Sequence, residues 1–218
     1  MSVSHAIPLR GAANPAQHVL TPPLVLALTG SAASNSRSTV LLREAAQRLR
    51  TRGIEVQEVG LHDFPPSDLI EVVYDGSAAR RLRDLVARTS ALIVSSPVYQ
   101  ASFSGGLKAM LDLLPERALQ GKAVLPVGSA GSPAHLLALE YSLNPVLSAL
   151  GARHILAGAY ATGDDVSWST EGAPVLAARL EARLRAGVDR LAEFAAPERA
   201  PLGVADIGHL LVQARFGV

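Results

Sequence analysis

The chain has 218 residues, of which 49% are apolar and 18% are charged, so it is long and apolar enough to bury one full hydrophobic core. It contains no cysteine, which excludes disulfide bonds and thiolate metal sites. Its formal net charge of +1 gives no reason to expect nucleic acid or a membrane as a partner.

Residues 1–23 are rich in alanine, proline, histidine and serine. They lack the basic start and apolar run of a secretory signal peptide, and no stretch of the chain reaches the roughly 18 apolar residues that a membrane span needs. We therefore expect a disordered leader over residues 1–23, one folded domain over residues 24–196 and a C-terminal tail over residues 197–218, in a cytoplasmic protein.

Short apolar runs alternate with helical patterns along the chain. Several runs are apolar on both faces, which is typical of strands that are covered on both sides. The helical segments place their apolar residues on one stripe, and the first of them is followed by Gly53, a residue that often ends a helix. In chain order we expect strand 24–29, helix 38–52, strand 54–59, helix 77–88, strand 91–95, helix 107–114, strand 123–127, helix 133–150, strand 153–160 and helix 174–194.

This alternation predicts an α/β fold in which helices cover both faces of a parallel sheet. Five strands favour a flavodoxin-like domain with the strand order 2-1-3-4-5. Ligands of such open sheets bind beyond the carboxyl ends of the strands. Three loops therefore become candidate binding segments: those that follow Thr29, Ser95 and Val127.

The first loop, residues 30–39, places hydroxyl groups, backbone N–H groups and the guanidinium of Arg37 at the start of a helix. Such donors suit a dianion. The loop matches neither the phosphate loop of nucleotide triphosphatases nor the G-x-G-x-x-G dinucleotide motif, so it favours a terminal phosphate monoester. The alternative is an ordinary polar loop in which Ser36 or Ser38 caps the helix.

The second loop begins with Pro97, which fixes the backbone as it leaves the sheet. Tyr99 offers a flat face that suits an aromatic ring, although it could equally cap the edge of the sheet. The third loop, Gly128 to Pro133, consists of small residues that keep space open and expose backbone N–H groups to a ligand. Its alternative is a plain turn with Pro133 at the first helical position.

The helix expected over residues 133–150 contains Pro145. Proline lacks an N–H group, and its ring would clash with the carbonyl four residues earlier, which belongs to Tyr141. We expect the helix to widen here into a π-type turn, with a simple bend at Pro145 as the alternative.

No side chain is assigned as a nucleophile, general base or metal ligand. The histidines lack metal-ligand spacing, and neither His135 nor His154 is expected to be essential. Asp164 and Asp165 are interpreted as a turn pair, and Trp168 more often packs against a loop than covers a ligand.

The three loops and the segment 107–150 resemble the NADPH-dependent FMN reductase family, and most closely the alkanesulfonate-type FMN reductases of two-component monooxygenase systems. The resemblance covers residues 24–196. It is carried by the loop at 30–39, by Pro97-Val98-Tyr99 and, most specifically, by the sequences LDLLPERALQGK at 111–122, AHLLA at 134–138 and NPVLSAL at 144–150.

The resemblance implies which residues bind FMN. The phosphate would be held by Ser31, Ser36, Arg37, Ser38 and Thr39. The ribityl chain and ring would be lined by Pro97, Val98 and Tyr99, and the ring edge would be bordered by Gly128, Ser129, Ala130, Gly131 and Ser132. The family often has Pro-Arg directly after Gly-Ser, where this chain has Ala32 and Ala33, so Arg37 becomes the main cation.

The resemblance also implies how the flavin is handled. In the alkanesulfonate-type reductases an inserted tyrosine, here Tyr141, is associated with a π-helix at a subunit interface near the flavin. This feature goes with FMN as a transient substrate and with dimers or tetramers.

We therefore expect hydride transfer from NADPH to FMN, with reduced flavin supplied to a monooxygenase of alkanesulfonate or other organosulfur metabolism. One alternative is a flavoprotein that retains FMN and reduces quinones or azo compounds. A flavodoxin-like electron carrier is another, but such carriers are typically strongly acidic and this chain is nearly neutral.

Overall fold

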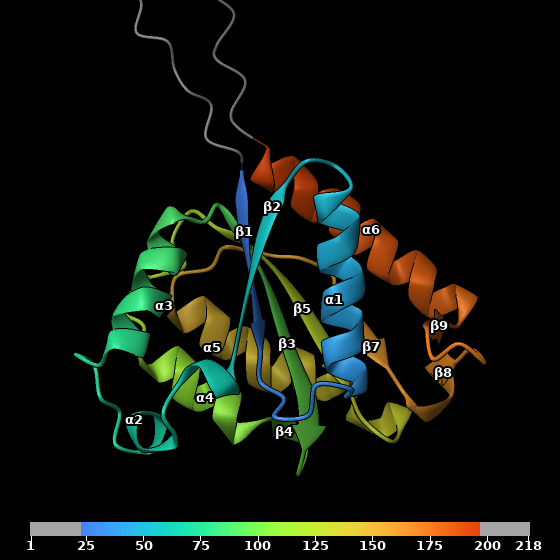
Figure 1. The fold of residues 1–218 in the computed structure, drawn as a ribbon, viewed down its shortest axis with the longest axis horizontal. Coiled ribbons are helices and arrows are strands. Elements are labelled where there is room, and N and C mark those ends of the chain that lie inside the picture. Colours follow the sequence, from blue (N-terminus) through green and yellow to red (C-terminus); the bar gives the residue numbers. More distant parts are fainter. Residues whose placement is uncertain (1–22, 197–218) are drawn as a thin grey trace, which may run out of the picture.

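The computed structural model describes residues 23–196, in which a mostly parallel sheet stands between two layers of helices (Figure 1). The predicted tail and all of the predicted leader except Pro23 lie outside these residues. The strands of the sheet are β1 (Leu24–Thr29), β2 (Glu55–Gly60), β3 (Ala91–Tyr99), β4 (Ser102–Phe103), β5 (Ala123–Ser129), β6 (His154–Ile155) and β7 (Ala159–Ala161).

The order of the sheet is β2-β1-β3-β5-β6, with β7 also paired to β5 and β4 paired antiparallel to the end of β3. With the two-residue β4 set aside, this is the predicted flavodoxin-like order. The fifth predicted strand, 153–160, differs because it is divided into β6 and β7, both parallel to β5. The division lies beside Pro126, which has no N–H group to donate to a neighbouring strand.

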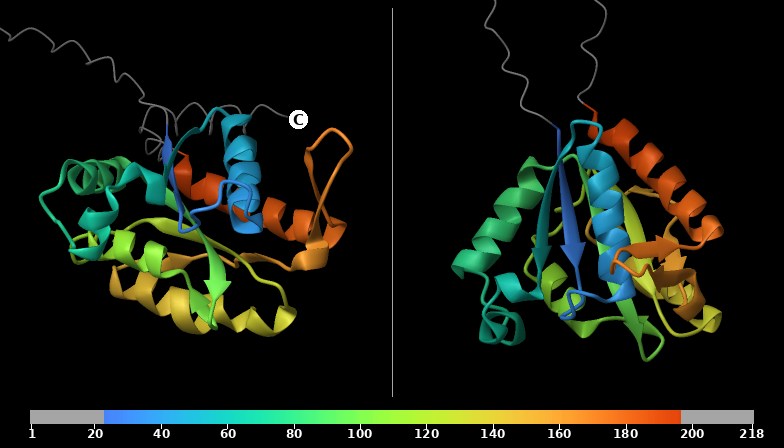
Figure 2. Two further views of the ribbon diagram at one scale, coloured as in Figure 1. Left: turned by 60° about the horizontal axis from the view of Figure 1, so that its bottom comes forward. Right: turned by 45° about the vertical axis from the view of Figure 1, so that its right-hand side comes forward.

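Helices cover both faces of the sheet (Figure 2). Their bounds are α1 (Arg37–Arg50), α2 (Pro66–Ile70), α3 (Ser77–Arg88), α4 (Gly105–Asp112), α5 (Asn144–Ala149) and α6 (Ala178–Ala195). Alternate residues of each strand point to opposite faces, so Val25 and Ala27 pack with α1 and α6, whereas Leu26 and Leu28 pack with α3 and α4.

Two predicted helices are wrong over part of their length. Residues 133–150 do not form one helix, but a 3-10 turn (Pro133–His135), a π-helix (Leu139–Leu143) and α5. The helix predicted over 174–194 begins only at Ala178, because Pro174–Leu176 form strand β9, which pairs antiparallel with β8 (Val166–Trp168). The sequence pattern predicts neither this hairpin nor α2.

The predicted widening near Tyr141 is confirmed. The N–H group of Asn144 donates to the carbonyl of Leu139, five residues earlier, as in a π-helix. Pro145 then lies in the first turn of α5, where its missing N–H group costs no helical hydrogen bond.

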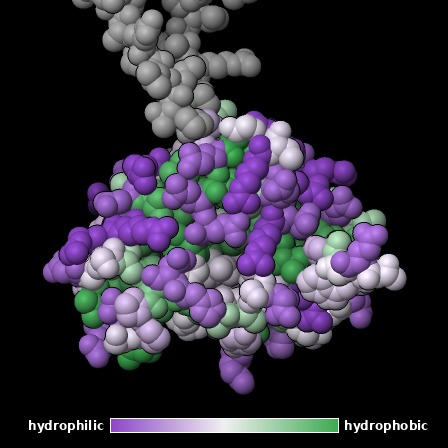
Figure 3. Space-filling view, viewed as in Figure 1, coloured by the Kyte–Doolittle hydropathy of each residue, from purple (hydrophilic) through white to green (hydrophobic). Residues whose placement is uncertain are grey.

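The face of the molecule seen in Figure 1 is mostly hydrophilic, with hydrophobic residues showing between the polar ones (Figure 3). Over residues 23–196, no helix is both long and apolar enough to cross a bilayer.

The close approach of the first loop to α4 generates a stability prediction. A Cβ atom at Gly30 would lie 2.5 Å from Cβ of Leu107 and 2.6 Å from Oγ of Ser104. We expect Gly30→Ala to lower the free energy of unfolding by about 1–3 kcal/mol, because the loop or α4 must move. Urea denaturation measures this change.

The matched control is Gly105→Ala, because a Cβ atom there meets no heavy atom within 4 Å. Gly105 begins α4, so its replacement should leave stability unchanged or raise it by about 0.5–1 kcal/mol. Equal losses in the two variants would contradict the steric explanation.

Candidate functional site

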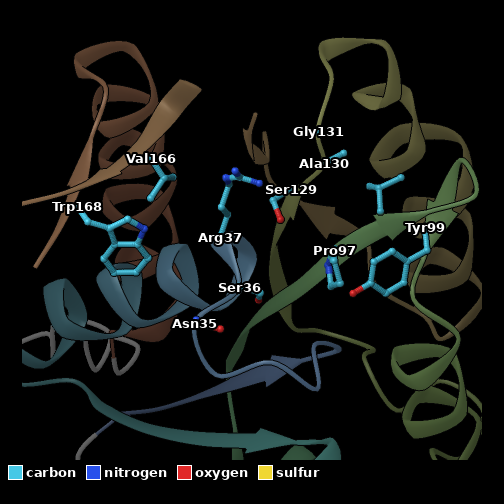
Figure 4. Close-up of a pocket in the computed structure, with 11 residues that line it drawn as sticks. Asn35, Ser36, Arg37, Pro97, Tyr99, Ser129, Ala130, Gly131, Val166 and Trp168 are labelled. Atoms are coloured by element: carbon cyan, nitrogen blue, oxygen red, sulfur yellow. The ribbon is translucent and has the colours of Figure 1, made fainter. Parts of the chain in front are cut away.

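The three predicted loops converge on one cavity of about 420 Å³ beyond the carboxyl ends of β1, β3 and β5 (Figure 4). The hairpin strand β8 completes its wall. The lining residues are Asn35, Ser36, Arg37, Pro97, Val98, Tyr99, Ser129, Ala130, Gly131, Val166 and Trp168.

The hydroxyl groups of the first loop divide into two sets. Ser36 lines the cavity and caps α1, since its Oγ accepts the N–H group of Thr39 at 3.2 Å. Ser31, Ser38 and Thr39 are buried and do not line it. The Ser31 hydroxyl bonds both backbone groups of Ala33, each at 3.1 Å, so these buried residues shape the loop from behind.

Arg37 supplies the positive charge of the cavity. It is exposed, and its side chain stands between Trp168 on one side and Ser129 on the other (Figure 4). None of the ion pairs among residues 23–196 involves it. Arg37 is also the first residue of α1, where backbone N–H groups have no partner within the helix. This end of the cavity is therefore suited to an anion.

The second loop is a tight hairpin. Strand β3 runs on to Tyr99, further than predicted, and Tyr99 pairs with Ser102 of β4. The turn between them is made by Gln100 and Ala101, both with positive φ. Val98 is buried, whereas 60% of Tyr99 is exposed, so the hairpin holds the phenol ring at the mouth of the cavity.

The third loop contributes Ser129, Ala130 and Gly131 to the cavity, but not Gly128 or Ser132. A Cβ atom at Gly128 would lie 2.8 Å from Leu139 of the π-helix, so this glycine allows close packing.

Two hydrogen bonds fix the third loop against the next strand. The N–H group of Ala130 donates to Ala161, at 3.1 Å, and the carbonyl of Ser132 accepts from the Tyr160 hydroxyl, at 2.8 Å. Burial raises the pKa of Tyr160, so this hydroxyl keeps its proton.

Sequence reasoning missed the contributions of Asn35, Val166 and Trp168. Trp168 was expected to pack against a loop, but 51% of its surface is exposed and it lines the cavity. The sequence signal that could have identified Trp168 is that the single tryptophan of the chain follows the predicted turn at Asp164 and Asp165. The exposed histidines His135 and His154 do not line the cavity.

The segment after β7 carries a fixed negative charge. Oδ2 of Asp165 accepts the hydroxyl of Thr162 at 2.6 Å and its N–H group at 2.7 Å. These two bonds hold the pKa of the Asp165 carboxyl below its usual range, and the charge of Arg179 acts in the same direction.

Within residues 23–196, no group of three histidine, aspartate or glutamate residues is placed to hold a metal ion. Arg37 and Tyr99 are the titratable side chains that line the cavity. The site is therefore equipped to bind and orient a ligand that carries an anionic group and a flat ring.

Comparison with known proteins connects this geometry to a family. The family model for NADPH-dependent FMN reductases matches residues 23–166. An FMN reductase (NADPH) of Pseudomonas putida KT2440 is 42% identical over 196 residues, which cover 89% of this chain and 100% of that protein. An FMN reductase (NADPH) of Escherichia coli K12 is 46% identical over 65% of this chain and 74% of its own length.

A solved structure gives the same result. The apo form of the NADH:FMN oxidoreductase EmoB superimposes with a TM-score of 0.71 and 31% sequence identity, covering 80% of this chain and 91% of its own.

The hydrogen bonds of Asp165 generate a pH prediction. A carboxyl whose pKa is lowered by folding stabilises the protein above its unfolded pKa of about 3.9, and this contribution is lost as the pH falls through the lower folded pKa. We expect Asp165→Asn to be less stable than the wild type at neutral pH, by less than about 1 kcal/mol because the carboxylate is partly exposed.

Denaturation of both proteins in a pH series measures the difference, which should shrink below about pH 4. A difference that stays constant with pH would show that the charge of Asp165 does not contribute.

Proposed function

The chain belongs to the NADPH-dependent FMN reductase family, and we propose that it binds FMN as a transient substrate and delivers the reduced flavin to a partner monooxygenase. As a member of this family it is an oxidoreductase that uses NADPH and FMN. The observation that supports the binding site is a single cavity with an anion-binding helix end, marked by Arg37, and an exposed aromatic ring, Tyr99.

The phosphate end of the proposed site is formed by Ser36, Arg37 and the first N–H groups of α1. These donors match the three oxygens of a phosphate monoester. Ser31, Ser38 and Thr39 hold the loop in this conformation through buried hydroxyl groups.

The ring end of the proposed site lies between the second and third loops. Pro97, Val98 and Tyr99 provide an apolar wall, and the small residues 129–131 leave room for the edge of the ring. Flavin and nicotinamide supply the hydride chemistry themselves when bound. The protein aligns the two rings and limits access of water.

The transient binding of FMN rests on the charge of the cavity. Ala32 and Ala33 stand where the family often has Pro-Arg, so Arg37 is the one guanidinium that lines the cavity in the described part of the chain. Each charged hydrogen bond to a phosphate contributes about 1.5–3 kcal/mol, and a site with one guanidinium holds its ligand less tightly than a site with two. We expect this lower affinity to allow the release of reduced FMN.

We further propose a homo-oligomer, a dimer or tetramer, that assembles through the π-helix. Leu137 and Tyr141 are 58% and 78% exposed and form an apolar surface there. The same helix contacts the binding site, because Oγ of Ser142 lies 2.6 Å from Oγ of Ser102, in the hairpin that carries Tyr99. Assembly would therefore act on the ring end of the site.

The partner monooxygenase is proposed to act on alkanesulfonates or other organosulfur compounds. The similarity of residues 107–150 to the alkanesulfonate-type FMN reductases supports this class of substrate.

The visible spectrum of the purified protein tests whether FMN is a substrate. We expect a colourless protein that oxidises NADPH only when FMN is added, because weakly held flavin is lost during purification. A yellow protein that reduces quinones or azo dyes without added FMN would show that the flavin is retained and would overturn the proposal.

Replacement of the main cation tests the position of the phosphate. We expect Arg37→Ala to raise the KM for FMN by roughly 10- to 100-fold, which corresponds to the loss of one charged hydrogen-bonding partner. Steady-state kinetics with FMN and with riboflavin, which has no phosphate, measure the effect. The KM for riboflavin should not change, and an unchanged KM for FMN would place the phosphate elsewhere.

A further inference from the structure

A second cavity, of about 240 Å³, lies at the carboxyl end of β7, next to the proposed FMN site. It is enclosed by the third loop, by the segment after β7 and by the first turns of α6. Six of its lining residues are Pro133, Tyr160, Thr162, Asp165, Arg179 and Arg183.

Neighbouring residues on the same two segments line the two cavities. On the third loop, Gly131 lines the FMN cavity and Pro133 lines the second cavity. On the segment after β7, Val166 lines the first and Asp165 lines the second. A long ligand that places one end against the flavin can therefore place its other end in the second cavity.

Two guanidinium groups give the second cavity a positive charge. Arg179 and Arg183 lie one helical turn apart on α6 and face the same side. Nε of Arg183 donates to the carbonyl of Gly158 at 3.0 Å, which orients this side chain and leaves its terminal nitrogens available. None of the hydrogen bonds or ion pairs found between side chains of residues 23–196 satisfies Arg179. Paired guanidinium groups of this kind suit a phosphate.

One carboxylate, that of Asp165, shares the cavity with these arginines. Thr162 occupies its Oδ2 atom through two hydrogen bonds, so Oδ1 remains as an acceptor. In dinucleotide-binding folds a carboxylate accepts from an unphosphorylated ribose hydroxyl, whereas an arginine accommodates the 2′-phosphate of NADP. Asp165 is thus left to accept from the free 3′-hydroxyl. The cavity thus offers two positive charges and one acceptor.

We propose that this cavity binds the 2′-phosphorylated ribose of NADPH, with Arg179 and Arg183 as the residues that distinguish NADPH from NADH. The assignment rests on the proposed position of FMN in the first cavity. The assignment would explain how a protein of this fold selects its nicotinamide donor, because the two FMN reductases above are named for NADPH and EmoB for NADH.

The cavity on the other side of the FMN site, behind Trp168, does not offer the same chemistry. Its arginine, Arg43, already donates to the carbonyl of Ser34 at 2.8 Å and lies 3.8 Å from Glu58. That cavity therefore holds one arginine and the carboxylate of Glu44, whereas the proposed cavity holds two arginines and one carboxylate.

The test is the kinetic preference of Arg179→Ala at saturating FMN. We expect kcat/KM for NADPH to fall by roughly 10- to 100-fold and kcat/KM for NADH to stay unchanged, because only NADPH carries the 2′-phosphate. The matched control is Arg185→Ala, which removes the same charge from the same helix at an exposed position that does not line the cavity. Equal losses with both donors, or no loss with either, would overturn the proposal.

Calorimetric titration gives a readout that does not depend on turnover. The wild type should bind 2′,5′-ADP more tightly than 5′-AMP, and Arg179→Ala should remove this difference. Equal affinity of the wild type for the two nucleotides would also overturn the assignment. Failure of the proposed function looks different, since a yellow, FMN-retaining protein would still distinguish 2′,5′-ADP from 5′-AMP.

Discussion

Two buried serine hydroxyls at the carboxyl end of β3 form hydrogen bonds to the first loop and to the residue that precedes α4. Oγ of Ser95 donates to the carbonyl of Ser38 at 2.7 Å, and Oγ of Ser96 accepts the N–H group of Ser104 at 2.8 Å. Ser104 in turn donates to the carbonyl of Gly30 at 2.6 Å and caps α4. Buried polar groups without such partners would be costly, so this network specifies one arrangement of the loops. The spacing between Arg37 at one end of the cavity and Tyr99 at the other depends on it.

Much of the fold could be predicted because burial on both faces leaves a clear pattern. The continuous apolar runs of β1 and β3 are typical of strands in a parallel sheet, and the topology then placed three loops at one edge. Shorter features gave no such signal. Strands β8 and β9 have three residues each, too few for periodicity, and the division between β6 and β7 depends on the neighbouring Pro126, which is distant in sequence.

The site was predictable at the level of loops and less so at the level of side chains. Ser36 and Ser38 are chemically identical and two residues apart, yet one lines the cavity and the other is fully buried. Which of them faces the cavity is decided by where α1 begins. The π-helix was predictable because the ring of Pro145 would clash with the carbonyl four residues earlier in a regular helix. The arginines of α6 gave no such signal, because in the sequence they look like the solvent-exposed face of any helix, and only the fold brings them beside Asp165.

The position of Trp168 has an optical consequence. It is the single tryptophan of the chain, half of it is exposed, and it forms a wall of the cavity near Arg37. Its ultraviolet fluorescence therefore comes from one known place in the molecule, and a flavin in this cavity would absorb that emission at short range. The protein thus contains a built-in reporter, through which the proposed binding and release of flavin can be timed by rapid mixing without any attached label.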